Sequence, residues 1–124
     1  ARRLDRRGGD TGPDRMIAER EKLEAAVEFI EKIGVPCFCC HEGEIAPEGA
    51  TFAESQANLA AMVDRAAGNM ARTGVKLLWG TANLFSHPRY AAGSATNPDP
   101  EVFAYAAAQV KAMLETTRQL GGAN

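Results

Sequence analysis

The stretch that decides the fold is Val75-Lys76-Leu77-Leu78-Trp79-Gly80-Thr81-Ala82-Asn83-Leu84-Phe85-Ser86. Its first residues are typical of a short strand, and the residues that follow open a polar loop that ends only near Pro100. In parallel α/β sheets, ligands bind at the carboxyl ends of strands, where such loops gather. We therefore predict a strand over 75–79 and a ligand-binding loop after it.

Residues 35–41 form a second apolar run that ends at His41, and a polar loop over 41–49 follows it. A continuous apolar run is typical of a parallel strand that is covered on both faces. The carboxyl ends of neighbouring parallel strands lie at one edge of the sheet. We therefore expect His41 and Trp79 to emerge side by side and to face the same hollow.

Helical spacing of apolar residues marks three further segments, at 16–33, 51–71 and 99–120. Thr51 and Glu54 have the spacing of a capping box, and Asp99 followed by Pro100 is typical of a helix start. Residues 1–15 are rich in Arg, Gly and Asp and show no apolar period, so we predict a loop there.

The order helix, strand, helix, strand, helix predicts an α/β domain over 1–124, with two parallel strands, three helices and a right-handed crossover. A (β/α)8 barrel and a doubly wound sheet both contain this unit, so the order alone leaves both open. The chain begins at Ala1 without a Met and stops after Gly121 and Gly122, where a further strand would be due. We therefore expect these residues to belong to a longer protein.

The composition is that of an ordinary globular domain, with 45% hydrophobic and 24% charged residues in a chain of 124. The net charge of −2 gives no reason to expect nucleic acid as a partner. No apolar run approaches the ~20 residues that a membrane span needs, so no membrane partner is expected. Cys37, Cys39 and Cys40 are too crowded for a disulfide framework, which favours a reducing, cytoplasmic setting.

His41 is the first candidate for chemistry, because an imidazole at a strand end can act as a general base near neutral pH. Glu44, three residues later, could reach back to the ring and fix its tautomer. The simpler interpretation is a histidine that ends a strand beside solvated glutamates. Spacing alone leaves both interpretations open.

Cys37, Cys39, Cys40 and His41 also suggest a thiol or metal-binding module without enzymatic activity. On a strand, however, Cys37 and Cys39 point to one side and Cys40 to the other, so the cluster cannot converge on one tetrahedral ion. Three small, buried core residues are the preferred interpretation.

Trp79 could form the wall of a small-molecule pocket, because such sites combine aromatic surface with a few polar groups. Thr81 lies two residues along the strand on the same side and offers a hydroxyl, and Phe85 could close the pocket. The alternative is that Trp79 packs in the core beneath the neighbouring loop.

Residues 75–85, together with Asn97-Pro98-Asp99-Pro100-Glu101-Val102-Phe103-Ala104-Tyr105-Ala106-Ala107, resemble xylose isomerase, in particular its longer-chain class. Val35-Pro36, His41 and Ile45-Ala46-Pro47-Glu48-Gly49 are similar to the second-strand segment of that family, and Leu120-Gly121-Gly122 also fits. The resemblance runs from about Ala25 to Asn124 and is poor over residues 1–20. It implies a (β/α)8 barrel in which this chain holds the second and third strands. It also implies an aldose–ketose isomerase that interconverts D-xylose and D-xylulose, and D-glucose and D-fructose.

By this resemblance, His41 is the histidine that opens the sugar ring, and Glu44 stands where the family has the aspartate that orients it. The glutamate side chain is one methylene longer and must fold back to reach the imidazole. Trp79 and Thr81 match residues that line the sugar pocket, and Phe85 matches the aromatic residue beside it. A tryptophan that the family carries before the first of these helices has no counterpart in positions 1–34.

The family uses two divalent ions, commonly Mg²⁺, Mn²⁺ or Co²⁺, which assist a 1,2-hydride shift. The resemblance places their ligands on later strands, so we assign no metal ligand in this chain. It implies a homotetramer that acts on a sugar, and we expect no turnover by these 124 residues alone. The remaining alternatives are a sugar-processing barrel of another kind, the thiol or metal-binding module built on Cys37 to His41, and a fragment without function.

Overall fold

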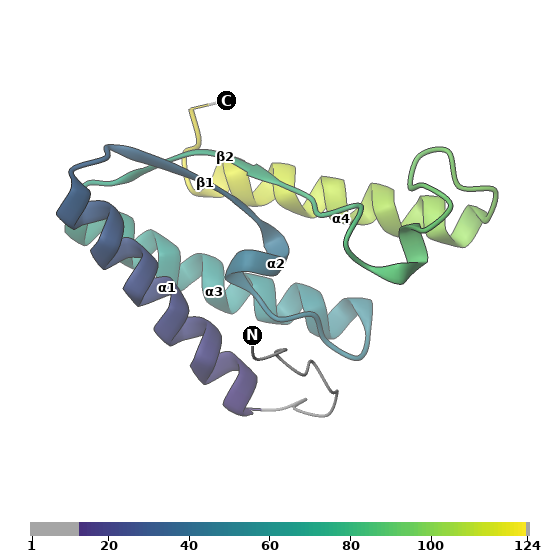
Figure 1. Cartoon of the computed structure of the whole chain (residues 1–124), viewed down its shortest axis with the longest axis horizontal. Coiled ribbons are helices and arrows are strands. Elements are labelled where there is room, and N and C mark those ends of the chain that lie inside the picture. Colours follow the sequence, from purple (N-terminus) through teal and green to yellow (C-terminus); the bar gives the residue numbers. More distant parts are fainter. Residues whose placement is uncertain (1–12, 124) are drawn as a thin grey trace, which may run out of the picture.

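A computed structural model describes residues 13–123 of the chain (Figure 1). In chain order, its elements are α1 (Pro13–Ile33), β1 (Cys37–His41), α2 (Glu42–Ile45), α3 (Phe52–Thr73), β2 (Lys76–Thr81), the 3-10 turn η1 (Pro88–Tyr90) and α4 (Pro100–Gln119). The predicted loop over 1–15 lies outside the described residues except for its last three, and those three are helical.

The two strands lie side by side and run parallel, and α3 forms the crossover between them. The register pairs Phe38 with Leu77, Cys39 with Trp79, Cys40 with Gly80 and His41 with Thr81. Leu78 is therefore an extra residue in β2, which forms a bulge between the first two of these pairs. The observed fold is α/β with parallel strands, as the element order predicts.

The described residues contain two short helical turns that the sequence analysis misses. Residues 42–45 form α2 inside the predicted loop, because the Glu44 carboxylate accepts the backbone N–H of His41 at 2.8 Å. In η1, the ring nitrogen Nδ1 of His87 accepts the backbone N–H of Arg89 at 3.0 Å. Turns of this length are too short to produce an apolar period, so the prediction of three helices is incomplete.

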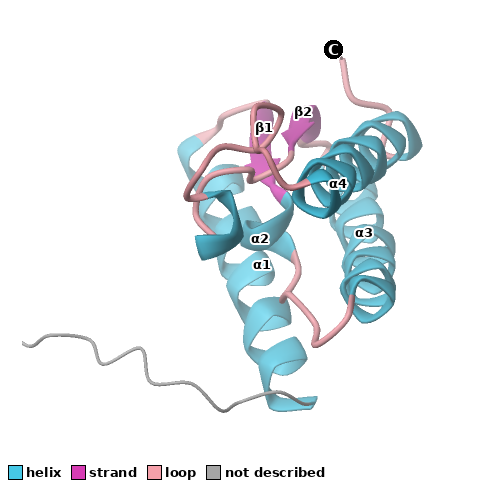
Figure 2. Cartoon of the chain, turned by 90° about the vertical axis from the view of Figure 1, so that its right-hand side faces the viewer, coloured by secondary structure: helices cyan, strands magenta, loops and turns pink. Residues whose placement is uncertain are grey.

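The helices of the described part all lie on one side of the strands (Figures 1 and 2). Cys40 and Leu77 are buried on that side, whereas Cys39 is exposed and Trp79 is 41% exposed. The predictions of strands covered on both faces and of three buried cysteines are therefore wrong for these residues. Cys37 is half-buried, and only Cys40 lies in the core.

The core lies between the strands and the helices beneath them. Its buried side chains are Leu23, Val27, Cys40, Ile45, Ala46, Leu59, Met62, Val63, Ala66, Leu77, Ala112, Met113 and Leu120. Close packing of α4 on β2 depends on Gly80, whose N–H donates to Thr117 Oγ1 at 3.0 Å. A Cβ atom on Gly80 would lie 2.6 Å from Met113 Cε. Among the helices described, none combines the length and the apolar character that a bilayer crossing requires.

Candidate functional site

His41 ends β1, and the turn α2 carries Glu44 back beside it. Oε2 of Glu44 accepts the backbone N–H of His41 at 2.8 Å and lies 3.4 Å from Nδ1 of the same histidine. The second distance exceeds the usual range for a hydrogen bond, so the contact with the ring is an electrostatic one. The turn α2 thus brings the longer glutamate side chain back toward the imidazole.

Phe85 packs against the same histidine from the loop that follows β2. The ring centroids of His41 and Phe85 are 5.8 Å apart, and the ring planes meet at 87°, which is an edge-to-face contact. The imidazole is half-buried, whereas Phe85 is 70% exposed. Residues from the ends of both strands therefore meet at His41.

Thr81 and Trp79 lie on the sheet face that carries His41. Thr81 pairs with His41 in the strand register, and Trp79 pairs with Cys39 one alternation earlier. Both side chains are exposed, so the alternative in which Trp79 packs in the core is wrong for the described residues. The face that we expected to form a hollow for His41 and Trp79 is open to solvent in this part of the chain.

Asn83 shapes the loop between Thr81 and Phe85. Its Oδ1 accepts the backbone N–H of Phe85 at 3.3 Å and that of Ser86 at 3.0 Å. Its Nδ2 donates to Ser86 Oγ at 2.9 Å. An asparagine side chain that bonds the backbone two and three residues ahead holds a tight turn, so the path of the chain toward Phe85 is defined.

Glu42 connects this loop to β1 and to α4. Its Oε2 accepts the backbone N–H of Asn83 at 2.6 Å, and its Oε1 accepts Nε2–H of Gln109 at 2.7 Å. Gln109 in turn accepts a hydrogen bond from the hydroxyl of Tyr90. The Tyr90 hydroxyl is protonated at neutral pH and able to donate, and burial raises its pKa further above the ordinary value.

The roles of Glu42 and Gln109 are not apparent from the sequence. The only local signal for Glu42 is its place directly after a strand end, between His41 and Glu44. Gln109 lies in the middle of α4 and carries no such signal.

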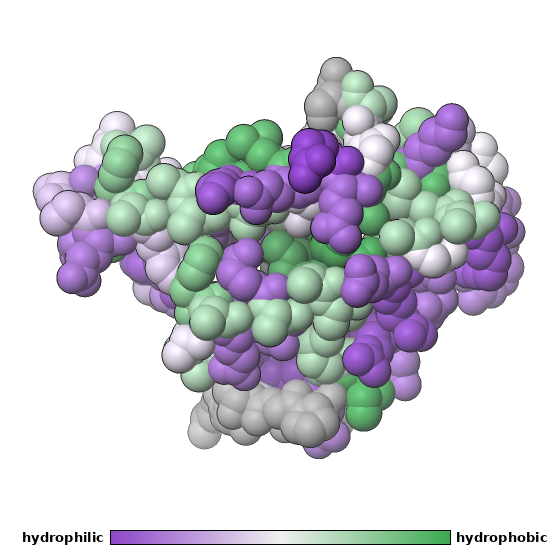
Figure 3. Space-filling model, turned by 180° about the vertical axis from the view of Figure 1, so that it is seen from behind, coloured by the Kyte–Doolittle hydropathy of each residue, from purple (hydrophilic) through white to green (hydrophobic). Residues whose placement is uncertain are grey.

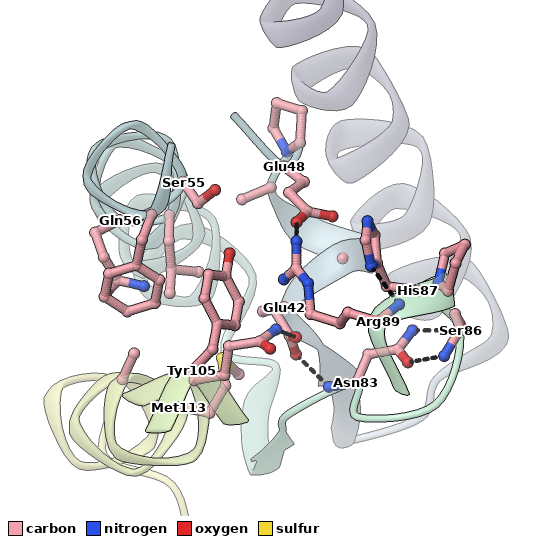
Figure 4. A pocket seen from close by; sticks show the side chains of 18 residues that line it. Glu42, Glu48, Ser55, Gln56, Asn83, Ser86, His87, Arg89, Tyr105 and Met113 are labelled. Atoms are coloured by element: carbon pink, nitrogen blue, oxygen red, sulfur yellow. Dashed lines mark hydrogen bonds and ion pairs between the residues drawn. The ribbon is translucent and has the colours of Figure 1, made fainter. Parts of the chain in front are cut away.

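A cavity of about 280 Å³ lies beside this network, between α3, α4 and the loop after β2 (Figure 4). Phe52, Leu59, Tyr105 and Met113 contribute to its apolar wall. Glu42 borders it, but His41 and Trp79 do not line it. The cavity is therefore separate from the predicted sugar-binding face.

Arg89 closes one side of this cavity (Figure 4). Its Nη2 donates to Glu48 Oε1 at 2.6 Å, and its guanidinium carbon lies 3.9 Å from the centroid of the Tyr105 ring. Phe52 meets Tyr105 edge to face at 5.1 Å. Burial is the largest single effect on the pKa of Arg89 and lowers it, but the interactions with Glu48 and Tyr105 together outweigh burial and raise this pKa. These contacts join the loops that follow the two strands.

Between residues 13 and 123, no three His, Cys, Asp or Glu side chains form a group that could hold a metal ion. The segment Cys37–His41 therefore provides no metal site. Burial, aided by the negative charge of Glu44, raises the pKa of the Cys40 thiol to about 11. Cys40 is consequently protonated at neutral pH and is a poor metal ligand or nucleophile.

No protein-family model matches the chain. Curated xylose isomerases do match it, with 56% identity for that of Roseobacter denitrificans, 55% for that of Cereibacter sphaeroides and 54% for that of Sinorhizobium fredii. Each match extends over 111 residues, which is 90% of this chain and 26% of the relative. The chain is homologous to a segment of xylose isomerase.

The chain spans about a quarter of the length of the xylose isomerases that it matches. A match of 111 residues is longer than the interval from Ala25 to Asn124, so the similarity begins upstream of Ala25. The resemblance seen in the sequence is thus confirmed and extends further toward the N-terminus.

Proposed function

We propose that these residues form the second and third β/α units of a (β/α)8 barrel that interconverts D-xylose and D-xylulose, and D-glucose and D-fructose. The observation that carries the proposal is the meeting of His41, Glu44 and Phe85 at the common end of two parallel strands. The identity of 53–56% to xylose isomerases supports the same assignment.

The open face of the strands supports a place within a larger barrel, which takes ~250 residues in all. Helices cover one face of β1 and β2, as they do outside a barrel, and the other face exposes Cys39, Trp79 and Thr81. Hydrophobic residues also reach the surface along the upper edge of the molecule, level with the strands (Figure 3). The remaining strands would cover this face and turn it into the interior of the barrel.

In the proposed reaction, the imidazole of His41 opens the sugar ring by taking the proton of the anomeric hydroxyl and returning a proton to the ring oxygen. Because Nδ1 faces Glu44, Nε2 is the nitrogen that meets the sugar. The Glu44 carboxylate holds the ring orientation and stabilises the imidazolium while it carries the proton. Thr81 offers a hydroxyl to the sugar, and Trp79 and Phe85 offer apolar walls.

The family's hydride shift uses two divalent ions, for which Mg²⁺, Mn²⁺ and Co²⁺ are the candidates. The described residues do not fit such ions, because they contain no group of three ligating side chains. We therefore propose that other strands of the whole barrel hold the metal, and that this segment contributes only ring opening and sugar contacts. A cytoplasmic homotetramer is part of the same proposal.

A chimera tests this function directly. The matching segment of the Roseobacter denitrificans xylose isomerase is replaced by this chain, and formation of D-xylulose is measured with and without Mg²⁺. We expect metal-dependent turnover, and a loss of at least ~100-fold in kcat/KM when His41→Gln removes the ring-opening base. His87→Gln is the matched control, because His87 only caps the turn η1, and it should retain activity. A folded, tetrameric chimera without turnover, or equal losses in the two variants, would overturn the proposal.

A further inference from the structure

Glu42 links α2 to the loop after β2 and to α4, and each oxygen of its carboxylate accepts a hydrogen bond. Oε2 accepts the backbone N–H of Asn83, in the loop after β2, at 2.6 Å. Oε1 accepts an N–H of the side-chain amide of Gln109, on α4, at 2.7 Å. We propose that Glu42 is a positioning residue, which fixes the loop after β2 so that Phe85 lies against His41; its catalytic consequence rests on the function proposed above.

A continuous series of contacts links Glu42 to His41. The Glu42 carboxylate holds the backbone of Asn83 through a short, charge-assisted hydrogen bond. The side chain of Asn83 then holds the backbone N–H of Phe85 at 3.3 Å, and the Phe85 ring meets the imidazole of His41 at 5.8 Å. Each step is a direct contact, so a change at Glu42 reaches the imidazole through a single loop.

The second oxygen of Glu42 anchors this arrangement to the core. Gln109 donates its amide N–H to Glu42 and accepts the hydroxyl of Tyr90, so both ends of the Gln109 amide are engaged. Tyr90 is buried. The hydrogen bond from α4 therefore fixes the carboxylate of Glu42, and the carboxylate in turn fixes the loop after β2. These two partners distinguish Glu42 from a solvated glutamate.

The two glutamates of α2 serve different partners. Glu44 lies beside Nδ1 of His41 and acts on the imidazole directly. Glu42 lacks such a contact among the described residues and acts through Asn83 and Phe85. The one-turn helix thus places one carboxylate beside the histidine and the other on the loop that leads to Phe85.

The first test uses the 124-residue chain and NMR. The probe is the nuclear Overhauser effect between the ring protons of His41 and Phe85, which reports their contact without any catalysis. Glu42→Ala should reduce this effect several-fold, while Glu42→Gln, whose amide oxygen still accepts from Asn83, should retain most of it. Glu115→Ala, an exposed carboxylate on α4, is the control and should leave it unchanged. A full effect in folded Glu42→Ala would overturn the proposal.

The second test uses the chimera. Glu42→Ala should lower kcat for D-xylose by about 10- to 100-fold with KM within about threefold, because small displacements of catalytic groups are costly, and Glu42→Gln should recover most of the loss. If Glu42→Ala does not fold, Gln109→Ala releases the other end of the carboxylate and should weaken the ring contact in the same way. If Glu42→Ala loses the contact between His41 and Phe85 but the unmutated chimera shows no turnover, only the proposed isomerase function is contradicted. An intact ring contact in the variants would contradict the positioning role, whatever the chimera does.

Discussion

The imidazole of His41 and the phenyl ring of Phe85 lie edge to face, 5.8 Å apart between centroids, although they come from the ends of different strands. The contact requires the parallel register that pairs His41 with Thr81 and the turn held by Asn83. A site at this point is therefore a product of two loops, and neither loop builds it alone.

Replacing Phe85 tests the value of that contact. In the chimera, Phe85→Ala should reduce kcat/KM for D-xylose by about tenfold, because an edge-to-face aromatic contact is worth about 0.5–1.5 kcal/mol and the apolar wall is lost as well. Phe103→Ala is the matched control, since Phe103 is also an exposed aromatic residue, on α4, and should leave kcat/KM unchanged. Similar losses for both variants would show that the effect is not specific to the site.

Gly80 and Gly68 should respond to alanine in opposite directions. Gly80→Ala should lower the free energy of unfolding by about 1–3 kcal/mol, because the new Cβ meets Met113 Cε at 2.6 Å and Thr117 Oγ1 at 2.9 Å. Gly68→Ala should raise it by about 0.5–1 kcal/mol, since Gly68 lies inside α3 with open space around it. Urea unfolding of the two variants measures both values, and a destabilised Gly68→Ala would contradict the packing described here.

Much of the fold follows from local sequence patterns. The apolar spacing indicates the long helices, and Thr51 caps α3 by accepting the N–H of Glu54, as its position predicts. Which face of each strand is exposed could not be predicted, because a continuous apolar run indicates a strand that is covered on both faces. Leu78 also shifts the alternation of β2 by one residue, and a bulge of this kind has no clear signal in a short apolar run.

The candidate site was only partly accessible from sequence. His41, Glu44 and Phe85 could be proposed from their positions after the strands and from a family resemblance. The role of Glu42 could not, because its partners Asn83 and Gln109 are distant in the chain and meet it only in the folded state. Such contacts depend on the packing of α4 against β2, which no local pattern specifies.

Removing the Arg89 side chain should weaken the structure around the cavity. Arg89→Ala should lower the free energy of unfolding by about 1–2 kcal/mol, because the guanidinium group bonds Glu48 at 2.6 Å and stacks on Tyr105 at 3.9 Å. Lys111→Ala breaks a largely exposed ion pair with Glu115 and should cost at most about 0.5 kcal/mol. Urea unfolding compares the two, and equal costs would show that the Arg89 contacts contribute little.

The three cysteines should differ in their reaction with a thiol reagent at pH 7.5. Cys39 is exposed and should react first, the half-buried Cys37 should follow, and Cys40 should react only after the chain unfolds. The pKa of Cys40, raised to about 11 mainly by burial, leaves almost no thiolate at this pH. Mass spectrometry of the labelled peptides identifies each site. Rapid labelling of Cys40 in the folded chain would contradict its place in the core.

The raised pKa of Cys40 also predicts how stability depends on pH. The thiol loses its proton near pH 9.0 in the unfolded chain and near pH 11 in the folded one, so deprotonation favours unfolding. The contribution of Cys40 to the free energy of unfolding is therefore complete below pH 9 and falls as the pH rises through 11, by on the order of 2 kcal/mol.

Urea unfolding of the wild type and of Cys40→Ala, measured between pH 8 and pH 11, isolates this effect from other groups that titrate in the same range. The alanine variant has a constant cost for the lost packing, so the difference in unfolding free energy between the two proteins should narrow as the pH rises. A constant difference for Cys40→Ala would mean that the thiol is not desolvated by the core.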